Sequence, residues 1–287
     1  LKVGISPVST VNALENIAAE IPYWDFEKAK NQAKSKWNHA LGKIDFKADD
    51  NTKAIFYTAL YHSYFAPTVF SDVNGDYMGT DKQVYNDKSH QNYTVFSLWD
   101  TYRALHPLMT ILEETKSKDY VSSMLKIYQQ QGKLPVWHLW ANETNTMVGL
   151  PAIPVIADAI LKGIVDKNEL ELAYKAIKTT AMGTDFGLKY VRDLKHIPIE
   201  YMDHESVAWA LEYAIADFGA YQAAKFLRKT EDAAYFEKRY KLYEQYFDIE
   251  VGHFVGRHEN GNFRIPFDPL MAKHLANDYC EGNAWQY

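Results

Sequence analysis

Residues 134–144, which read LPVWHLWANET, are the stretch best suited to chemistry. They place Trp137, Asn142 and Glu143 close together, and the lone carboxylate follows two tryptophans and a histidine. Apolar indole faces around Glu143 would disfavour its ionised form, and a carboxylic acid that keeps its proton near neutral pH can act as a proton donor. The alternative is a tryptophan-rich plug with a salt-bridged Glu143, and the sequence leaves both open.

Residues 203–207, DHESV, place His204 and Glu205 at the start of a strongly periodic helical segment. A carboxylate in the first turn of a helix gains from the helix dipole and stays ionised, which suits a metal ligand. The competing prediction is a capping arrangement in which Asp203 is the N-cap residue.

Residues 264–269, RIPFDP, hold Asp268 on a turn flanked by two prolines. Rigid placement is what a general base needs, although an aspartate before proline also forms simple Asx-turns. Residues 99–103, WDTYR, combine Trp99 and Asp100 in the stacking and polar pair that grips a sugar ring. Asp100 and Arg103 could equally pair on one helix face.

Three other kinds of site are not supported by the sequence. Residues 72–76, DVNGD, begin like an EF-hand loop, but Tyr77 and Gln83 stand where that loop requires Gly and Glu. The ten histidines lack the i, i+4 pairing of a zinc protease helix, and no G-x-S-x-G motif is present. Calcium-loop, zinc-hydrolase and serine-hydrolase functions are therefore disfavoured.

The elements that must position these residues are mainly helices, because apolar residues recur at spacings of three and four. Asp25, Asp166, Asp203 and Glu231 lie where helices should begin, and Gly132 and Gly163 lie where helices should end. An Asn260–Gly261 turn predicts one hairpin, over 253–266. The predicted helices span 26–44, 52–65, 95–113, 118–131, 151–164, 167–181, 186–195, 204–228 and 231–247.

Composition narrows the class of protein. The chain has 287 residues, 47% of them hydrophobic, with a net charge of -6 that argues against nucleic-acid binding. Its longest apolar runs are about ten residues, too short for the roughly 20 residues that a membrane-spanning helix needs. Cys280 is the only cysteine, so no internal disulfide is expected. One soluble domain is the default expectation.

Several motifs together resemble glycoside hydrolase family 92, the calcium-dependent exo-α-mannosidases. The strongest match is residues 92–107, NYTVFSLWDTYRALHP. The resemblance continues in chain order through 57–63, 70–75, 134–137, 142–144, 204–207, 266–269 and 281–287. It therefore spans almost the whole chain, and the ordered set is more specific than any single motif.

The resemblance implies a mainly α fold, an (α/α)6 toroid that is incomplete in residues 1–287, with a short β-hairpin near the C-terminus. It implies inverting, calcium-dependent hydrolysis of terminal α-linked mannose, with an α-1,2 linkage expected, from glycans such as N-glycans. By motif position Glu143 is the expected acid, Asp268 the expected base and Glu205 a calcium ligand. The expected substrate-binding residues are His204, Trp99, Asp100, Trp137 and Asn142.

The chain also departs from the family pattern. An N-terminal β-sandwich domain and a C-terminal closing segment are expected outside residues 1–287, so this chain is expected to be part of a catalytic domain. Residues 138–141 differ from the usual run, and 185–202 have the length of an insertion. A periplasmic or secreted location is expected because glycans are mostly met there.

Two other functions fit parts of the sequence. One is another toroidal glycosidase, similar to a trehalase or a glucosidase, which would not depend on calcium. The other is a non-catalytic helical scaffold that binds sugars.

Overall fold

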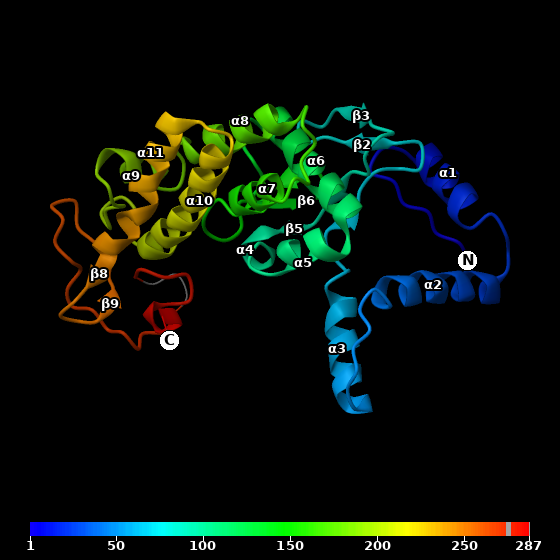
Figure 1. Ribbon diagram of the computed structural model, residues 1–287, viewed down its shortest axis with the longest axis horizontal. Coiled ribbons are helices and arrows are strands. Elements are labelled where there is room, and N and C mark those ends of the chain that lie inside the picture. The colour runs from blue at the N-terminus through cyan, green and yellow to red at the C-terminus, as the bar shows by residue number, and fades with distance from the viewer. Residues whose placement is uncertain (274–276, 287) are drawn as a thin grey trace.

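Helices are the main regular elements of the computed structural model, which describes residues 1–273 and 277–286 (Figure 1). The α-helices are α1 Thr10–Glu20, α2 Phe26–Leu41, α3 Asp50–His62, α4 Leu98–Thr101, α5 Leu105–Leu112, α6 Glu114–Gln131, α7 Ala152–Leu161, α8 Leu170–Ala181, α9 Leu188–Asp193, α10 Ser206–Phe226 and α11 Thr230–Tyr240. Two 3-10 helices, η1 Lys241–Tyr246 and η2 Asn283–Gln286, follow. The predicted mainly α architecture is confirmed.

The core lies between α6, α7, α8, α10 and α11 (Figure 1). Helix α7 reads AIPVIADAIL and buries most of its faces, as expected of a helix with almost no polar residues. Helix α10 crosses it closely because Gly219 has no side chain, and a Cβ there would lie 3.1 Å from Pro154 Cα. The central helices therefore pack almost backbone to backbone.

Most predicted helices are present with shifted ends, and α1 was not predicted. Ser9 caps α1 by accepting a hydrogen bond from the Asn12 N–H at 3.0 Å. The single helix predicted over 95–113 is wrong. Strand β5, Phe96–Ser97, comes first, and α4 and α5 are separated by residues 102–104.

The predicted helix boundaries had mixed outcomes. Asp25 caps α2 through the Lys28 N–H, and Gly132 ends α6 in the left-handed conformation, both as predicted. The prediction of Asp203 as a cap is wrong, because Glu205 is the N-cap residue of α10 and makes no side-chain cap hydrogen bond. The Asp203 carboxylate instead contacts His204 Nδ1 at 2.6 Å.

The predicted hairpin near the C-terminus is present in altered form. Its turn joins Arg257 and Phe263 in an isolated antiparallel bridge, with Gly261 at φ +86°. However, strand β9, His253–Phe254, pairs with β8, Phe247–Asp248, and not with the segment after the turn. The sequence did not reveal β8 because its two residues continue an apparently helical pattern.

The remaining strands are short and form the loops that surround the candidate site. Strand β1, Thr68–Val69, pairs with β4, Tyr93–Thr94, and β2, Asp76–Met78, pairs with β3, Val84–Asn86. Strand β5 pairs with β6, Trp137–Leu139, which pairs with β7, Asn142–Glu143. All of these pairings are antiparallel.

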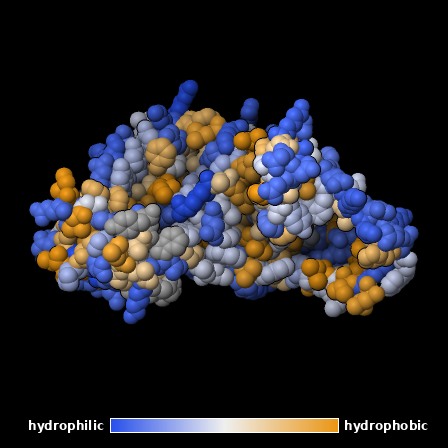
Figure 2. All heavy atoms as spheres, turned by 90° about the horizontal axis from the view of Figure 1, so that it is seen from below, coloured by the Kyte–Doolittle hydropathy of each residue, from blue (hydrophilic) through white to orange (hydrophobic). Residues whose placement is uncertain are grey.

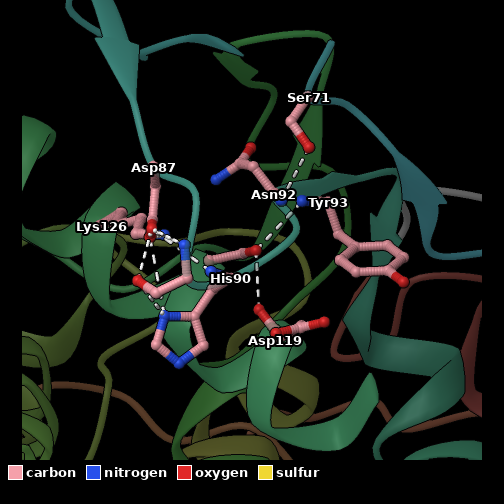
Figure 3. A network of polar contacts seen from close by, with 9 residues as sticks. Ser71, Asp87, His90, Asn92, Tyr93, Asp119 and Lys126 are labelled. Carbon is pink, nitrogen blue, oxygen red and sulfur yellow. Dashed lines mark hydrogen bonds and ion pairs between the residues drawn. The ribbon is translucent and has the colours of Figure 1, made fainter. Parts of the chain in front are cut away.

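A polar network fixes the segment that leads into β4 and β5 (Figure 3). Asp87 pairs with Lys126 of α6 and also accepts a hydrogen bond from the His90 N–H at 3.3 Å. The Tyr93 N–H donates to Ser123 Oγ of the same helix at 3.0 Å. Helix α6 therefore sets the position of β4, and through it of β5.

Helices α1 and α2 lie at one end of the molecule, and α3 extends away from the main core (Figure 1). Apolar side chains gather at this end beside a hollow (Figure 2), and Leu1, Val3, Trp24 and Phe26 are exposed there. A cavity of about 810 Å³ lies between the N-terminal segment and Trp140. No helix within the described residues is long and apolar enough to cross a membrane.

Candidate active site

The hairpin β6–β7 carries three of the predicted site residues: Trp137, Asn142 and Glu143. Its two turn residues, Trp140 and Ala141, have φ of +49° and +59°. Two consecutive left-handed residues are typical of a type I′ turn, which normally uses Asn and Gly because other side chains are strained there. Backbone strain of this kind persists only where the surroundings enforce it, and it often marks a functional site.

Contacts from three directions hold this strained turn. The Trp140 N–H donates to Thr94 Oγ1 of β4 at 2.8 Å. Lys82 Nζ donates to the Ala141 carbonyl at 2.5 Å and to Asn142 Oδ1 at 2.6 Å. The Asn142 amide donates back to the Trp140 carbonyl at 2.8 Å. These hydrogen bonds hold the Asn142 side chain against the turn. The Trp140 side chain is 50% exposed and lines the cavity.

Backbone N–H groups hold the Glu143 carboxylate. Oε1 accepts from the Trp137 N–H at 2.9 Å and from the Asn145 N–H at 2.8 Å, and Oε2 accepts from the Val136 N–H at 2.8 Å. The salt bridge offered by the alternative interpretation is absent from the described contacts of Glu143, and the hydrogen bonds among them come from peptide N–H groups. These three donors fix the orientation of the side chain.

Opposite Glu143, the neighbouring strand places a neutral histidine. His138 lies opposite Glu143 in the β6–β7 register and is 3% exposed. Burial, together with the positive charge of Lys82, lowers the pKa of His138 to about 4. Its Nδ1 lies 3.2 Å from Thr94 Oγ1. His138 therefore places no positive charge next to Glu143 at neutral pH.

Helix α4 places Trp99 and Asp100 directly after β5, whose Ser97 pairs with Trp137. Asp100 is exposed and accepts from Ser97 Oγ at 2.7 Å. The alternative in which Asp100 pairs with Arg103 is wrong, since Arg103 pairs with Glu212 of α10 at 2.5 Å. Strand β5 thus brings Trp99 and Asp100 to the sheet that bears Glu143.

His204 and Glu205 lie where α10 begins. Glu205 has φ +62°, a conformation that non-glycine residues rarely adopt, and its N–H donates to the Asn277 carbonyl at 2.7 Å. The Cys280 thiol forms a hydrogen bond with the Glu205 side chain. Burial, and to a lesser extent the negative charge of Glu205, raise the pKa of Cys280 to about 12. The His204 side chain is 48% exposed.

Asp268 is exposed and forms the Asx-turn that the sequence offered as its alternative role. Its Oδ1 accepts from the Leu270 N–H at 3.0 Å. Its carbonyl accepts from the Asn283 amide at 2.9 Å. The turn therefore presents one side of the carboxylate to solvent while its backbone is fixed to the C-terminal segment.

The predicted residues fall into two groups. Trp99, Asp100, Trp137, Asn142 and Glu143 share the sheet β5–β6–β7 and the helix that follows it. Glu205 and Asp268 are held by the C-terminal segment 277–283, and His204 directly precedes Glu205. The two groups meet at Trp99, which packs against the apolar cluster that contains Val207 and Cys280.

Some residues that support the site were not predicted. They are Lys82, Glu212, Arg264, Asp278, Cys280 and Asn283. Arg264 and Asn283 had a local signal, because they lie in the RIPFDP motif and in the match over 281–287. The others act on partners far away in sequence.

The donor atoms near Glu205 agree with a hard metal ion. Calcium takes six to eight oxygen ligands, including carboxylates and amide carbonyls. Glu205 supplies a carboxylate. Asn283 lies on the 277–283 segment that contacts Glu205, and its buried Oδ1 has no hydrogen-bond partner among the described residues. No three His, Cys, Asp or Glu side chains converge within 1–273 and 277–286, so backbone, water or sugar oxygens would have to complete a site.

Comparisons with known proteins identify the family. The model of the glycosyl hydrolase family 92 catalytic domain matches residues 12–287. The family GH92 α-mannosidase BT3965 from Bacteroides thetaiotaomicron is 38% identical, with a TM-score of 0.91 over 96% of this chain and 37% of that one. The family GH92 inverting mannosidase BT2199 from the same species is 27% identical, with a TM-score of 0.87 over 98% of this chain and 39% of that one.

A curated protein is also similar. An uncharacterized secreted glycosidase of Arthroderma benhamiae is 26% identical over 96% of this chain and 35% of its own length. The chain thus spans between about a third and two fifths of the relatives that it matches. With a family match over almost its entire length, the chain belongs to glycoside hydrolase family 92.

Proposed function

We propose that the protein containing this chain is an inverting, calcium-dependent exo-α-mannosidase that releases terminal α-1,2-linked mannose from glycans, N-glycans included. The observation that carries this proposal is the strained β6–β7 turn, which holds Glu143 on the same short hairpin as Trp137 and Asn142 within sequence that matches a glycosidase catalytic domain. The relatives named as α-mannosidases favour mannose over glucose as the sugar.

The proposed reaction uses two carboxyl groups. In an inverting glycosidase one group protonates the leaving oxygen while the other activates a water, across a gap of about 6.5–9.5 Å. Glu143 is the proposed acid. Its Oε2 accepts one N–H where Oε1 accepts two, so Oε2 has more room for the transferred proton. Asp268 is the proposed base, because its exposed carboxylate on a braced turn can hold a water.

The sugar is proposed to lie between the two groups of residues. Aromatic faces bind the apolar side of a sugar ring, and carboxylates, amides and imidazoles bind its hydroxyls. The residues assigned to these contacts are Trp99, Asp100, Trp137, Asn142 and His204.

Calcium is the proposed cofactor. The Glu205 carboxylate is its proposed first ligand, and the amide oxygen Oδ1 of Asn283 is a proposed second one. When bound, the ion would orient sugar hydroxyls and help distort the ring toward the oxocarbenium-like transition state. The protein's part is to fix the Glu205 carboxylate, through the left-handed cap and the Cys280 thiol, before the ion arrives.

The catalytic unit is proposed to be larger than residues 1–287, with an N-terminal β-sandwich domain and a C-terminal closing segment. The lengths of the relatives and the exposed apolar surface around Trp24 and Phe26 support this proposal. A periplasmic or secreted location is proposed on the name of the fungal relative.

The direct test is mannose release from α-1,2-mannobiose by the full-length protein, with and without EDTA, followed by proton NMR. Release of the β-anomer that EDTA abolishes would support the whole proposal. Retained configuration would refute the mechanism. Activity that survives EDTA would favour a metal-independent toroidal glycosidase, and no release from any α-mannoside would favour a non-catalytic scaffold.

The roles of the carboxylates can be separated by leaving group. Glu143→Gln should lower kcat by about 10²–10⁴-fold on mannobiose, as loss of a general acid does. An aryl mannoside with a good leaving group should restore much of this rate in Glu143→Gln but not in Asp268→Asn. Glu114→Gln, which changes an exposed acid on α6, is the matched control. Restoration in Glu205→Gln in place of Glu143→Gln would mean that Glu205 is the acid.

A further inference from the structure

We propose that Asp278 is a positioning residue, whose buried carboxylate joins the turn that bears Asp268 to the start of α10, which bears His204 and Glu205. This inference rests on the proposed function, because it concerns the placement of the residues assigned there. Neither the sequence motifs nor the comparisons point to Asp278.

The Asp278 side chain is fully buried and accepts hydrogen bonds from three separate segments. Its Oδ1 accepts from Arg264 Nε at 3.0 Å and from Ser206 Oγ at 3.4 Å. Its Oδ2 accepts from the Gly256 N–H at 2.7 Å. A single carboxylate therefore connects the strand β9 region, the RIPFDP turn and the first residue of α10.

The backbone beside Asp278 completes the start of α10. The first N–H groups of a helix have no partner within the helix, and α10 has no side-chain cap. The Asn277 carbonyl accepts from the Glu205 N–H at 2.7 Å, and the Asp278 carbonyl accepts from the Ala208 N–H at 3.0 Å. Residues 277–278 thus act as the missing cap and hold Glu205 in its left-handed conformation.

Arg264 carries the connection toward the proposed base. It precedes Asp268 by four residues, and its guanidinium also donates from Nη2 to the Asp203 carbonyl at 3.0 Å. The planar guanidinium fixes two acceptors in one rigid geometry, whereas a lysine ammonium is a point charge on a flexible stem. The Arg264 guanidinium therefore ties the segment 203–205 to the turn that contains both Arg264 and Asp268.

The approach of Gly256 shows how closely this arrangement is built. A Cβ at this position would lie 2.2 Å from Asp278 Oδ1 and 2.9 Å from an Ile199 methyl carbon. Any larger residue would displace the carboxylate. Glycine at position 256 thus allows the backbone N–H to reach Asp278 Oδ2.

A buried ion pair is a poor way to gain stability, since well-packed apolar residues often do as well or better. The Asp278–Arg264 pair instead fixes the relative positions of the segments that carry the proposed site residues, because each partner contacts one of those segments. Misplacement of a reacting group by about 1 Å can cost about 100-fold in rate. The role of Asp278 should therefore appear in turnover and not in stability alone.

The test is Asp278→Asn in the full-length protein. The amide keeps an acceptor for Gly256 but loses the charge that faces Arg264. We expect kcat on α-1,2-mannobiose, at saturating substrate and calcium, to fall by about 10- to 100-fold. We also expect faster amide hydrogen exchange in 203–208 and 264–271 at a temperature where circular dichroism shows a native fold.

The matched control is Asp217→Asn, which breaks a second buried Asp–Arg pair, that of Asp217 with Arg239. Asp217 lies twelve residues beyond Glu205 in the same helix, about 18 Å away along its axis. Its loss should destabilise the fold but leave the kcat of the folded protein unchanged. Arg264→Gln should resemble Asp278→Asn, and the double variant should be no worse than either single one if the two residues act as a pair.

The outcomes separate the two proposals. If the wild-type protein releases mannose and Asp278→Asn keeps its kcat, or if Asp217→Asn loses as much, the positioning role is overturned while the proposed function stands. If the wild-type protein releases no mannose, the proposed function fails and the positioning role fails with it. A selective loss in Asp278→Asn and Arg264→Gln would support both.

Discussion

His106 offers a direct test of how the core responds to pH. Its side chain on α5 is 4% exposed, and its Nε2 has no hydrogen-bond partner in the part of the chain that the structure describes. Burial lowers the pKa of His106 from 6.5 to about 4. Between these two values the unfolded chain binds a proton that the folded chain does not, so stability falls as the pH decreases from 6.5 to 4. One pH unit corresponds to about 1.4 kcal/mol, which gives about 2 kcal/mol at pH 5.

The perturbation is His106→Leu, which removes the titrating group and the unpaired nitrogen. Urea unfolding at pH 8 and at pH 5 gives the free energy of unfolding of both proteins. The variant should gain about 2 kcal/mol relative to wild type between the two pH values. His138, whose pKa is also lowered to about 4, is present in both proteins and cancels. His39→Leu, at an exposed position on α2, is the matched control.

A difference between wild type and His106→Leu that is the same at pH 8 and pH 5 would refute this reasoning. It would mean that the folded and unfolded chains bind a proton at His106 equally well. An equal gain in His39→Leu would also refute it, because burial would then not be the cause.

Two further predictions concern stability. Arg239→Met should lower the free energy of unfolding by about 3–5 kcal/mol, because it leaves the Asp217 carboxylate buried without its cation, and thermal unfolding should show it. Ser9→Ala should cost about 1 kcal/mol through loss of the α1 cap, and amide exchange in residues 10–13 should rise, whereas Ser63→Ala, at the C-terminal end of α3, should leave that exchange unchanged.

The long helices could be predicted from the sequence because their apolar stripes have a helical period and their ends carry local signals. Asp25 before α2 and Gly132 after α6 behave as such signals should. Helix α7 was predictable for a different reason, since ten mostly apolar residues between loops must be buried somewhere. These features depend only on neighbours within a few residues.

The short strands and their strained turn could not be predicted, because their causes lie elsewhere in the chain. Trp140–Ala141 has none of the residues that favour a type I′ turn, and it is held in place by Thr94 and Lys82. The candidate acid was found from its motif, but its hydrogen bonds to backbone N–H groups were not foreseen. Asp278, with partners at residues 206, 256 and 264, has no local signature at all.

Glu212 decides how the two groups of site residues lie relative to each other. It projects from α10 and accepts from Arg103 at 2.5 Å and from the Tyr102 hydroxyl at 3.0 Å, both directly after α4. Gly149, in the loop after Glu143, approaches it so closely that an added Cβ would lie 2.6 Å from Glu212 Cβ, and its φ of +96° already excludes most other residues. The sheet that bears Glu143 and the helix that begins at Glu205 are thus set against each other by packing and charge at Glu212, seven residues beyond Glu205. The geometry that a two-carboxylate reaction needs therefore depends on contacts between segments far apart in sequence.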